Sequence, residues 1–417
     1  MTRIIQVCVI PLLLIANVVA AEPITLNVTY SSNIYTDVLR QTAAAFEKDH
    51  PDIRIKYRTP VPNTYDELLQ STIRSGAVND LPDLSLQGNQ NIVVIASRGL
   101  AAPLDGLIKD DKEWAGLGYA PSLGNFGRVH EKTYALAYAT SVPTVFINVD
   151  LLRKAGVSQI ERLKSWEELT AGAKKVQALG RGYVGGLFDY QSAGNWTFQA
   201  LVTSQGVPFL TDDGSQIAFN GKSGMKALQI LKNFGDAGTV DMTQPQMLQA
   251  FASGTVGVLA SYSAAFDKIQ EVSKGKFELR TLAWPMLSPE GRLPAGGRAV
   301  VIFAKDKRRQ QASWEFAKFL VGQISQTILV KGVGAVPVNT IAIKRQGLLA
   351  TYYIENPNQA VSLSATSRLT NWSTYPGENS VRISEVVKDN LRHVLIEHQN
   401  PQPVLERMVS EIGRLMK

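Results

Sequence analysis

The alternation of strand-like and helix-like segments after residue 23 constrains the fold of this chain more than any other feature of its sequence. Ile24 to Tyr30 alternates apolar and polar residues as a strand does, whereas Thr36 to Lys48 repeats apolar residues with a helical period. Pro51 ends that helix, and Ile53 to Tyr57 alternates again. Strands that alternate with helices build layered α/β domains, so the sequence predicts an α/β fold.

Later segments continue this pattern. Capping boxes at Thr64–Glu67 and Ser165–Glu168 predict the starts of two helices, and the second of these is expected to end at Gly180–Gly182. The chain after Gln310 is predicted to be mainly helical. Three apolar runs predict further strands: Val145–Ile147, Val256–Leu259 and Ala299–Phe303.

The first 21 residues have the pattern of a cleavable export signal. Arg3 is their only charged residue, an almost continuous apolar run extends from Ile4 to Ile15, and Val19-Ala20-Ala21 offers a cleavage site. A membrane-spanning helix needs roughly 20 apolar residues, more than this run contains. Cys8, the only cysteine of the chain, lies inside the run and too early to accept a lipid. The mature chain is therefore expected to have no thiol chemistry.

Length and charge point to a soluble protein with more than one domain. Without residues 1–21, the 417-residue chain still exceeds the ~250–300 residues at which a single core stops growing. The net charge is +7, but the charges are interspersed. Their densest cluster, Lys305–Arg309, lies at a predicted helix start and is interpreted as solvated surface. Nucleic acid is therefore not an expected partner.

Motifs for catalysis, metal binding or cofactor binding are missing from the sequence. The four histidines have no metal-ligand spacing, and there is no nucleophile elbow, phosphate-binding loop or dinucleotide fingerprint. The glycine cluster Ala295–Arg298 lacks the lysine of a phosphate loop. We expect no catalytic residue, metal or cofactor. Paired carboxylates have no sequence signature, so a secreted carbohydrate-active enzyme stays open as an alternative.

Several segments, in their order and spacing, resemble the bacterial extracellular solute-binding proteins of family 1, the ligand-capturing subunits of ABC importers. They cover nearly the whole mature chain: Phe46–Ile55, Leu81–Leu86, Tyr138–Asp150, Phe251–Val258 and Gly332–Val338. The resemblance implies a two-lobed periplasmic binding protein fold, with hinge strands and a ligand cleft between the lobes. Lobe one would comprise residues 22–140 and about 286–335, and lobe two about 141–285 and 336–417.

The resemblance also implies a function, partners and a location. The expected function is capture of a sugar, polyol or phosphodiester ligand by hinge closure, followed by delivery to ABC permease subunits in the inner membrane. An exported chain without a lipid anchor is useful for this task only where an outer membrane retains it, so the periplasm is the expected location. The protein is expected to be a monomer and no enzyme. A ligand sensor that takes no part in transport is a further alternative.

Some candidate ligand-binding residues follow from their position in the predicted elements. Ligands of open α/β sheets bind beyond the carboxyl ends of the strands. Asn89 follows the strand Leu84–Leu86, and it could face a ligand or only cap a helix at Gln90–Ser97. Trp196 and Trp372 are flanked by residues typical of loops, where their rings could cover a sugar face or a quaternary ammonium, or could belong to the core. Trp166 and Trp314 are interpreted as packing residues within helices.

Other candidates come from the resemblance, which is strongest to the glycerol-phosphate-binding proteins and their relatives. Arg382, in the first turn of a predicted helix, matches a ligand arginine, although Glu378 offers a structural partner instead. The remaining matches are Tyr65, Ser141, Gly297 and one of the three residues Ser261, Tyr262 and Ser263. Asn89 and Ala335 depart from a glutamate and a tyrosine of that subgroup. These departures make a related phosphodiester, a polyol or an oligosaccharide at least as good a candidate as glycerol phosphate.

Overall fold

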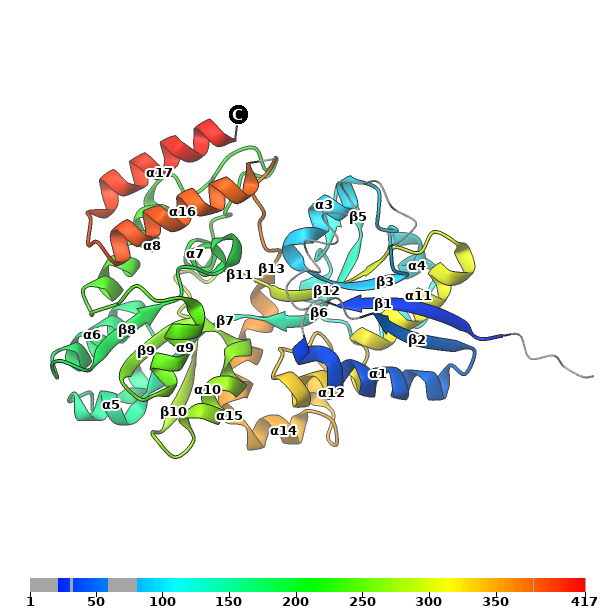
Figure 1. Ribbon diagram of the computed structural model, residues 1–417, viewed down its shortest axis with the longest axis horizontal. Helices are drawn as coiled ribbons and strands as arrows, with labels where there is room; N and C mark the ends of the chain where they lie inside the picture. Colours follow the sequence, from blue (N-terminus) through cyan, green and yellow to red (C-terminus); the bar gives the residue numbers. More distant parts are fainter. Residues whose placement is uncertain (1–21, 31–32, 59–80, 378, 417) are drawn as a thin grey trace, which may run out of the picture.

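The computed structural model describes residues 22–30, 33–58, 81–377 and 379–416. The predicted export signal, the capping box at Thr64–Glu67 and Tyr65 lie outside these ranges. Two mixed α/β lobes make up the described chain (Figure 1), which confirms the predicted two-lobed fold.

Lobe one is built on a five-stranded sheet with the order β2-β1-β3-β12-β6. Its strands β1, β2 and β3 run parallel, and β12 lies antiparallel between β3 and β6. All four strands predicted for this sheet are present, and their ends lie within three residues of the predicted ones. The bounds are β1 (Ile24–Tyr30), β2 (Ile53–Arg58), β3 (Leu84–Gly88), β6 (Ala135–Ser141) and β12 (Gly296–Ile302).

Helices cover both faces of this sheet; α1 and α12 lie on one side and α3 on the other (Figure 1). Asn339 ties α13 to the lobe, because its Nδ2 donates to the carbonyls of Leu117 and Val321 at 2.8 and 3.1 Å. The helices are α1 (Thr36–Asp49), α3 (Ile92–Ser97), α4 (Asp105–Asp110), α11 (Lys307–Val321), α12 (Gln323–Val333) and α13 (Thr340–Lys344), with a small hairpin of β4 (Arg128–Val129) and β5 (Lys132–Thr133).

Lobe two is built on a four-stranded sheet with the order β10-β7-β9-β8. Its core contains Trp166, which meets Trp284 edge-on with ring centroids 4.7 Å apart, so this residue packs as predicted. The strands are β7 (Pro143–Asn148), β8 (Val184–Phe188), β9 (Val256–Tyr262) and β10 (Leu279–Ala283). The helices are α5 (Val149–Lys154), α6 (Trp166–Gln177), α7 (Trp196–Thr203), α8 (Lys222–Gly235), α9 (Gln244–Ala252), α10 (Phe266–Ser273), α16 (Ser380–Leu395) and α17 (Pro401–Leu415).

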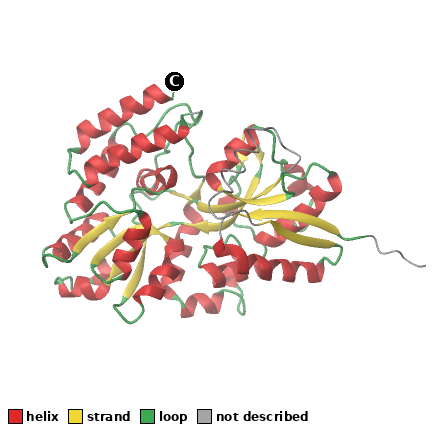
Figure 2. Cartoon of the chain, in the orientation of Figure 1, coloured by secondary structure: helices red, strands yellow, loops and turns green. Residues whose placement is uncertain are grey.

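Local sequence signals explain several element ends. Ser165 forms the predicted capping box with Glu168 at the start of α6, with both reciprocal bonds present. Asp306 caps α11 by accepting from the amide of Arg309 at 2.9 Å. Figure 2 shows that helices surround the strands of both sheets, which is the layered arrangement that the strand–helix alternation predicts.

The chain passes between the lobes more than once. β6 leads directly into β7 through Val142, and the chain returns through β11 (Leu293–Pro294) into β12. β13 (Leu369–Thr370) precedes α16 and pairs in parallel with β11. Short helices α14 (Ala350–Glu355) and α15 (Pro357–Ala360) precede β13. The connecting segments thus lie side by side between the two sheets.

This topology fixes where the two sheets face each other. β3 and β6 end at lobe two, because β6 continues into β7 and β3 is parallel to it through their shared neighbour β12. In lobe two, β8 and β9 run parallel and both end next to the start of β7, since Tyr262 pairs with Pro143. We call the carboxyl ends of β3, β6, β8 and β9, with the start of β12, the interlobe edge.

Candidate functional site

Ser141 and Ser263 join the two lobes at the interlobe edge. Their hydroxyl oxygens lie 3.3 Å apart, and the amide of Val142 donates to the Ser263 hydroxyl at 3.1 Å. Both side chains are more than nine-tenths buried. The structure therefore brings together two residues that the sequence places 122 positions apart, at the point where the chain first crosses between lobes.

Asn89 lies at the end of β3 and is only 6% exposed. Its Nδ2 donates to the carbonyl of Ala295 at 2.7 Å, so the amide is fixed across to the strand that returns from lobe two. The alternative role as a helix cap is wrong: the chain enters a 3-10 turn at Asn89–Asn91 before α3, and no side-chain cap is formed at either start. Oδ1 of Asn89 is buried and has no partner in the described chain.

Trp196 and Trp372 lie close together at the interlobe edge, with ring centroids 6.2 Å apart. Trp372 lies in a loop as predicted, but Trp196 is the first residue of α7, so its predicted loop position is wrong. The indole of Trp196 donates to the carbonyl of Pro294 at 3.0 Å, which connects lobe two to the returning strand. Trp196 is 5% exposed, whereas Trp372 is half-buried. The more exposed ring is thus the one better placed to cover a ligand.

Gly297 occupies a position on β12 that requires glycine. Its φ is +108°, and a Cβ placed there would lie 1.8 Å from the carbonyl oxygen of Ala139. The pairing of β12 with β6 shifts register one residue further on, between Arg298 and Ala299. The backbone irregularity lies at the interlobe edge, where bulges commonly redirect side chains.

Asp189, which the sequence analysis missed, lies directly after β8 and next to the predicted residues Ser261 and Tyr262. Its Oδ2 accepts from Nε2 of Gln244 at 2.7 Å and lies 3.5 Å from the Ser261 hydroxyl, while Oδ1 is buried without a partner. Burial raises the pKa of Asp189 to about 6. Burial, together with the charge of Asp189, also raises the pKa of Tyr262 to about 12. An acidic residue directly after a buried apolar strand was the available sequence signal.

Arg298 is a second charged residue that the sequence analysis did not assign. It follows Gly297 on β12 and pairs with Gly88, the last residue of β3. Its charge acts on Tyr35: burial raises the pKa of this tyrosine, and Arg298 opposes the rise. Arg298 is half-buried, and within the described ranges its guanidinium makes no ion pair or hydrogen bond.

Arg382 lies elsewhere in the molecule. It is exposed in the first turn of α16, where it lines a groove of about 570 Å³ between α16 and α17 together with Arg407 and Arg414. The structure therefore does not bring it against the other candidates, and its ligand role stays a prediction. Its alternative partner Glu378 lies outside the described residues, as does Tyr65.

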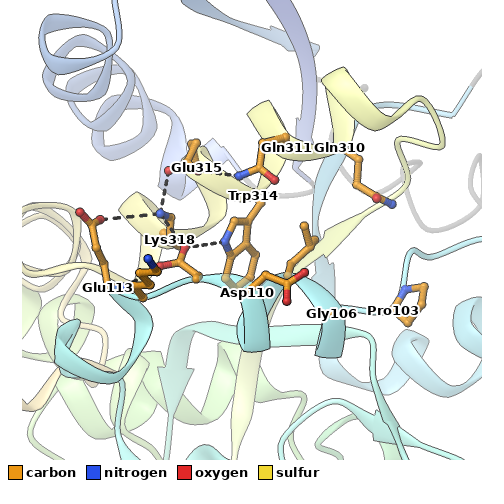
Figure 3. A pocket seen from close by; sticks show the side chains of 12 residues that line it. Pro103, Gly106, Asp110, Glu113, Gln310, Gln311, Trp314, Glu315 and Lys318 are labelled. Atoms are coloured by element: carbon orange, nitrogen blue, oxygen red, sulfur yellow. Dashed lines mark hydrogen bonds and ion pairs between the residues drawn. The ribbon is translucent and has the colours of Figure 1, made fainter.

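A surface pocket of about 710 Å³ lies in lobe one between α4 and α11 (Figure 3). Lys318 extends into it and is bound by Asp111 and Glu315, both at 2.7 Å. The indole of Trp314, which packs in α11 as predicted, also donates to Asp111. Because these charges satisfy one another, the pocket is interpreted as a structural ion-pair network and not as the ligand site.

The described residues also bear on membrane insertion and metal binding. None of the helices there combines the length and the apolar character that crossing a membrane requires. Nor do the described ranges contain a group of three or more His, Cys, Asp or Glu residues able to hold a metal ion.

Two α/β lobes that present polar and aromatic side chains where their sheets face each other form the architecture of a ligand-binding protein. A family model for bacterial extracellular solute-binding proteins matches residues 41–348. The chain therefore belongs to the bacterial extracellular solute-binding proteins. This finding confirms the family that the sequence resembles.

Individual relatives are distant but cover nearly the whole chain. A binding protein of Brucella abortus is 24% identical over 392 residues, with 89% of this chain and 88% of the relative covered. The sn-glycerol-3-phosphate-binding periplasmic protein of Pectobacterium atrosepticum is 22% identical over 406 residues, with 90% and 87% covered.

Solved structures show the same fold. The cyclic alpha-maltosyl-1,6-maltose binding protein of Arthrobacter globiformis superposes with a TM-score of 0.80 at 20% identity, covering 95% of this chain and 99% of the other. The Mycobacterium tuberculosis UgpB complex with glycerophosphocholine gives 0.78 at 18% identity, with the same shares covered. These neighbours bind chemically different ligands, so the fold alone leaves the ligand of this chain open.

Proposed function

We propose that this chain is the periplasmic substrate-binding subunit of an ABC importer, which captures a carbohydrate, polyol or glycerol-phosphate-type ligand between its lobes and delivers it to permease subunits. One observation carries the proposal: buried polar atoms from both lobes lie without partners at the interlobe edge. Among those of the described chain are Oδ1 of Asn89 in lobe one, Oδ1 of Asp189 in lobe two and Nε1 of Trp372.

The energetics of these atoms favour a ligand that contacts both lobes. A buried polar group without a hydrogen-bond partner costs about 1–3 kcal/mol, and more if it is charged. A ligand that donates to both groups removes two such costs only when the lobes are closed around it. Its affinity then differs between open and closed states, which is what drives hinge closure.

The proposed binding surface combines this polar pair with its neighbours at the interlobe edge. Ser141 ends β6, Gly297 lies at the start of β12, Ser263 directly follows β9, and Trp372 adds a partly exposed ring. Hydroxyl-rich ligands suit such a surface, since hydroxyls bind the polar groups and the apolar face of a sugar packs against a ring. The side chains that complete the surface are Trp196, Ser261 and Tyr262.

Thermal unfolding of the mature protein, refolded to remove carried-over ligand, tests the proposal. The panel comprises glycerol phosphates, glycerophosphodiesters, polyols and di- to trisaccharides. A ligand at 100 times its Kd adds about 2.7 kcal/mol of stability, which gives a clear rise in Tm. We expect at least one member to raise the Tm and to be recovered unchanged. Conversion of a glycan into products would instead support a carbohydrate-active enzyme.

A matched pair of serine variants tests whether the ligand binds at the interlobe edge. Ser261 lies buried near the carboxyl end of β9. Ser253 is exposed before the amino end of β9, and within the described chain its hydroxyl bonds to Ala250 and Thr255 alone. Ser261→Ala should weaken ligand binding about tenfold, while Ser253→Ala should leave it unchanged. Equal affinities of both variants and the wild type would place the ligand elsewhere.

A further inference from the structure

Two unpaired charges of opposite sign lie on opposite sides of the interlobe edge. Arg298, in lobe one, is half-buried and has no ion pair or hydrogen bond within the described ranges. Asp189, in lobe two, is fully buried, and its partners in the described chain are uncharged: the side chains of Gln244 and Ser261 and the backbone amide of Gln191. A charge removed from water without an opposite charge is unfavourable unless a ligand compensates for it.

The carboxylate is held in one orientation. Oδ2 of Asp189 accepts from Gln244, which leaves Oδ1 without a partner in the described chain. Gln244 and Tyr262, which lie beside it, are only partly buried, so they form its solvent-facing side. An ionised carboxylate accepts hydrogen bonds and offers none. The vacant side of this group therefore suits a ligand hydroxyl and repels a ligand oxyanion.

The guanidinium of Arg298, in contrast to the carboxylate of Asp189, favours anionic groups. Arg298 stays charged at all accessible pH values and offers donors in a planar fork that matches carboxylate and phosphate oxygens. It lies beside Gly88 and Ala139, at the ends of β3 and β6 that face lobe two. Arg382, the anion-binding arginine that the sequence suggests, is instead exposed in the groove between α16 and α17.

We infer that ligand recognition is divided by charge between the lobes: Arg298 binds an anionic group, and Asp189 accepts hydrogen bonds from hydroxyls of the same molecule. The ligand class is then an anionic polyol, whose acidic group is a phosphate or a carboxylate. This inference rests on the proposed function, because it assumes a ligand between the lobes. It adds the orientation of that ligand and excludes neutral sugars as the preferred class.

Titration calorimetry of the refolded mature protein tests the inference. Glycerol 3-phosphate and gluconate represent phosphate and carboxylate polyols, and maltose and glycerol are the neutral probes. We expect at least one anionic probe to bind at least tenfold more tightly than either neutral probe. A preference between glycerol 3-phosphate and gluconate identifies which acidic group the site takes.

Substitutions at Arg298 and Asp189 test whether these two residues cause the preference for anionic probes. Arg298→Gln should weaken the anionic probe about 10- to 100-fold and abolish the preference over neutral probes, while Arg298→Lys should lose less. Asp189→Asn should weaken the anionic polyol by a similar factor. The matched controls Arg308→Gln and Asp212→Asn remove one exposed charge of each sign and should have no effect. Circular dichroism checks the fold; if Asp189→Asn does not fold, the arginine variants decide alone.

Several results would overturn the inference. If neutral probes bind as tightly as anionic ones, the inference is overturned but the proposed function is not. Loss of anion binding in Arg382→Gln but not in Arg298→Gln would show that Arg382 on α16, and not Arg298, binds the anionic group. Equal weakening of neutral and anionic probes in both variants would indicate an ion pair between the lobes in place of ligand contacts. Failure of all probes, and of the wider panel, would overturn the proposed function as well.

Discussion

At the scale of single residues, Gly297 is fixed by two separate constraints. Its φ of +108° lies in the region that favours glycine, and any Cβ would meet the carbonyl of Ala139. Gly180 shares the first constraint without the second, since its φ is +107° and nothing lies within 4 Å of a Cβ. The two glycines therefore separate backbone strain from crowding.

Replacing each glycine by alanine should give different losses of stability. Gly180→Ala should cost about 1 kcal/mol, from the unfavourable φ alone. Gly297→Ala should cost at least about 2 kcal/mol more, because β12 must move away from β6 to accommodate the new atom. Urea unfolding measures both. Similar losses in the two variants would mean that β12 adjusts without cost.

Residue roles were also the hardest part to predict from sequence. Ser141 and the segment Ser261–Ser263 were expected to lie at the ligand site, and the structure places them together at the interlobe edge. Asp189 and Arg298 were missed, because their significance depends on which partners they lack. The absence of a partner is a property of the folded chain, and it has no counterpart in local sequence pattern.

At the scale of elements, helix ends show what sequence signals can and cannot predict. The capping box at Ser165 was predicted and is present, because both of its residues lie within one turn. Asn89 was a plausible cap, but its amide bonds to Ala295 instead, 206 residues away. Trp196 lies in a helix despite its loop-like flanking residues, since the preceding turn ends immediately before it. In both cases a hydrogen bond to a residue far along the chain, Ala295 for Asn89 and Pro294 for Trp196, outweighs the local sequence signal.

Asn339 combines a local cap with a tertiary contact. Its Oδ1 accepts from the amides of Ile341 and Ala342 at the start of α13, while its Nδ2 donates to Leu117 and Val321. Asn400 caps α17 through a single bond on the surface. The pair therefore compares a buried asparagine cap with an exposed one.

We expect Asn339→Ala to lower the free energy of unfolding by about 3 kcal/mol or more, because buried carbonyls lose their donors as well as the cap. Asn400→Ala should cost only about 1 kcal/mol. Chemical denaturation of both variants checks the difference. An equal, small loss in the two variants would show that α13 does not hold lobe one together.

At the scale of the whole molecule, the order and spacing of the segments that resemble the solute-binding family predicted more than any single motif. The two-lobed fold and the family were both foreseen, because strand–helix alternation and segment spacing persist along the whole chain. The identity of the ligand could not be predicted from the sequence. The solved structures with this fold include a cyclic alpha-maltosyl-1,6-maltose binding protein and a complex with glycerophosphocholine, so the fold alone does not predict the ligand.

The free energy of unfolding should depend on pH through the titration of Asp189. Burial raises its folded-state pKa to about 6 from 3.8, so the folded protein binds the proton more tightly than the unfolded chain. This contribution is present below about pH 4 and is lost as the pH rises through about 6; it amounts to about 3 kcal/mol. Nearby Tyr262, whose pKa is raised to about 12, does not titrate in this range.

Urea unfolding of the wild type and Asp189→Asn at pH 4 and pH 7.5 checks this expectation. The stability of the wild type relative to the variant should fall by about 3 kcal/mol between the two pH values. Other titrating groups cancel in the comparison because both proteins contain them. A constant difference would mean that Asp189 is solvated in the folded state.

Small-angle X-ray scattering of the mature protein, with and without the ligand found in the panel, tests the central claim most directly. If the ligand is captured between the lobes, saturation should reduce the radius of gyration as the lobes close, and Ser261→Ala should need more ligand for the same change. Identical scattering curves at saturating ligand would contradict capture by closure, and would place the ligand on a surface outside the interlobe edge.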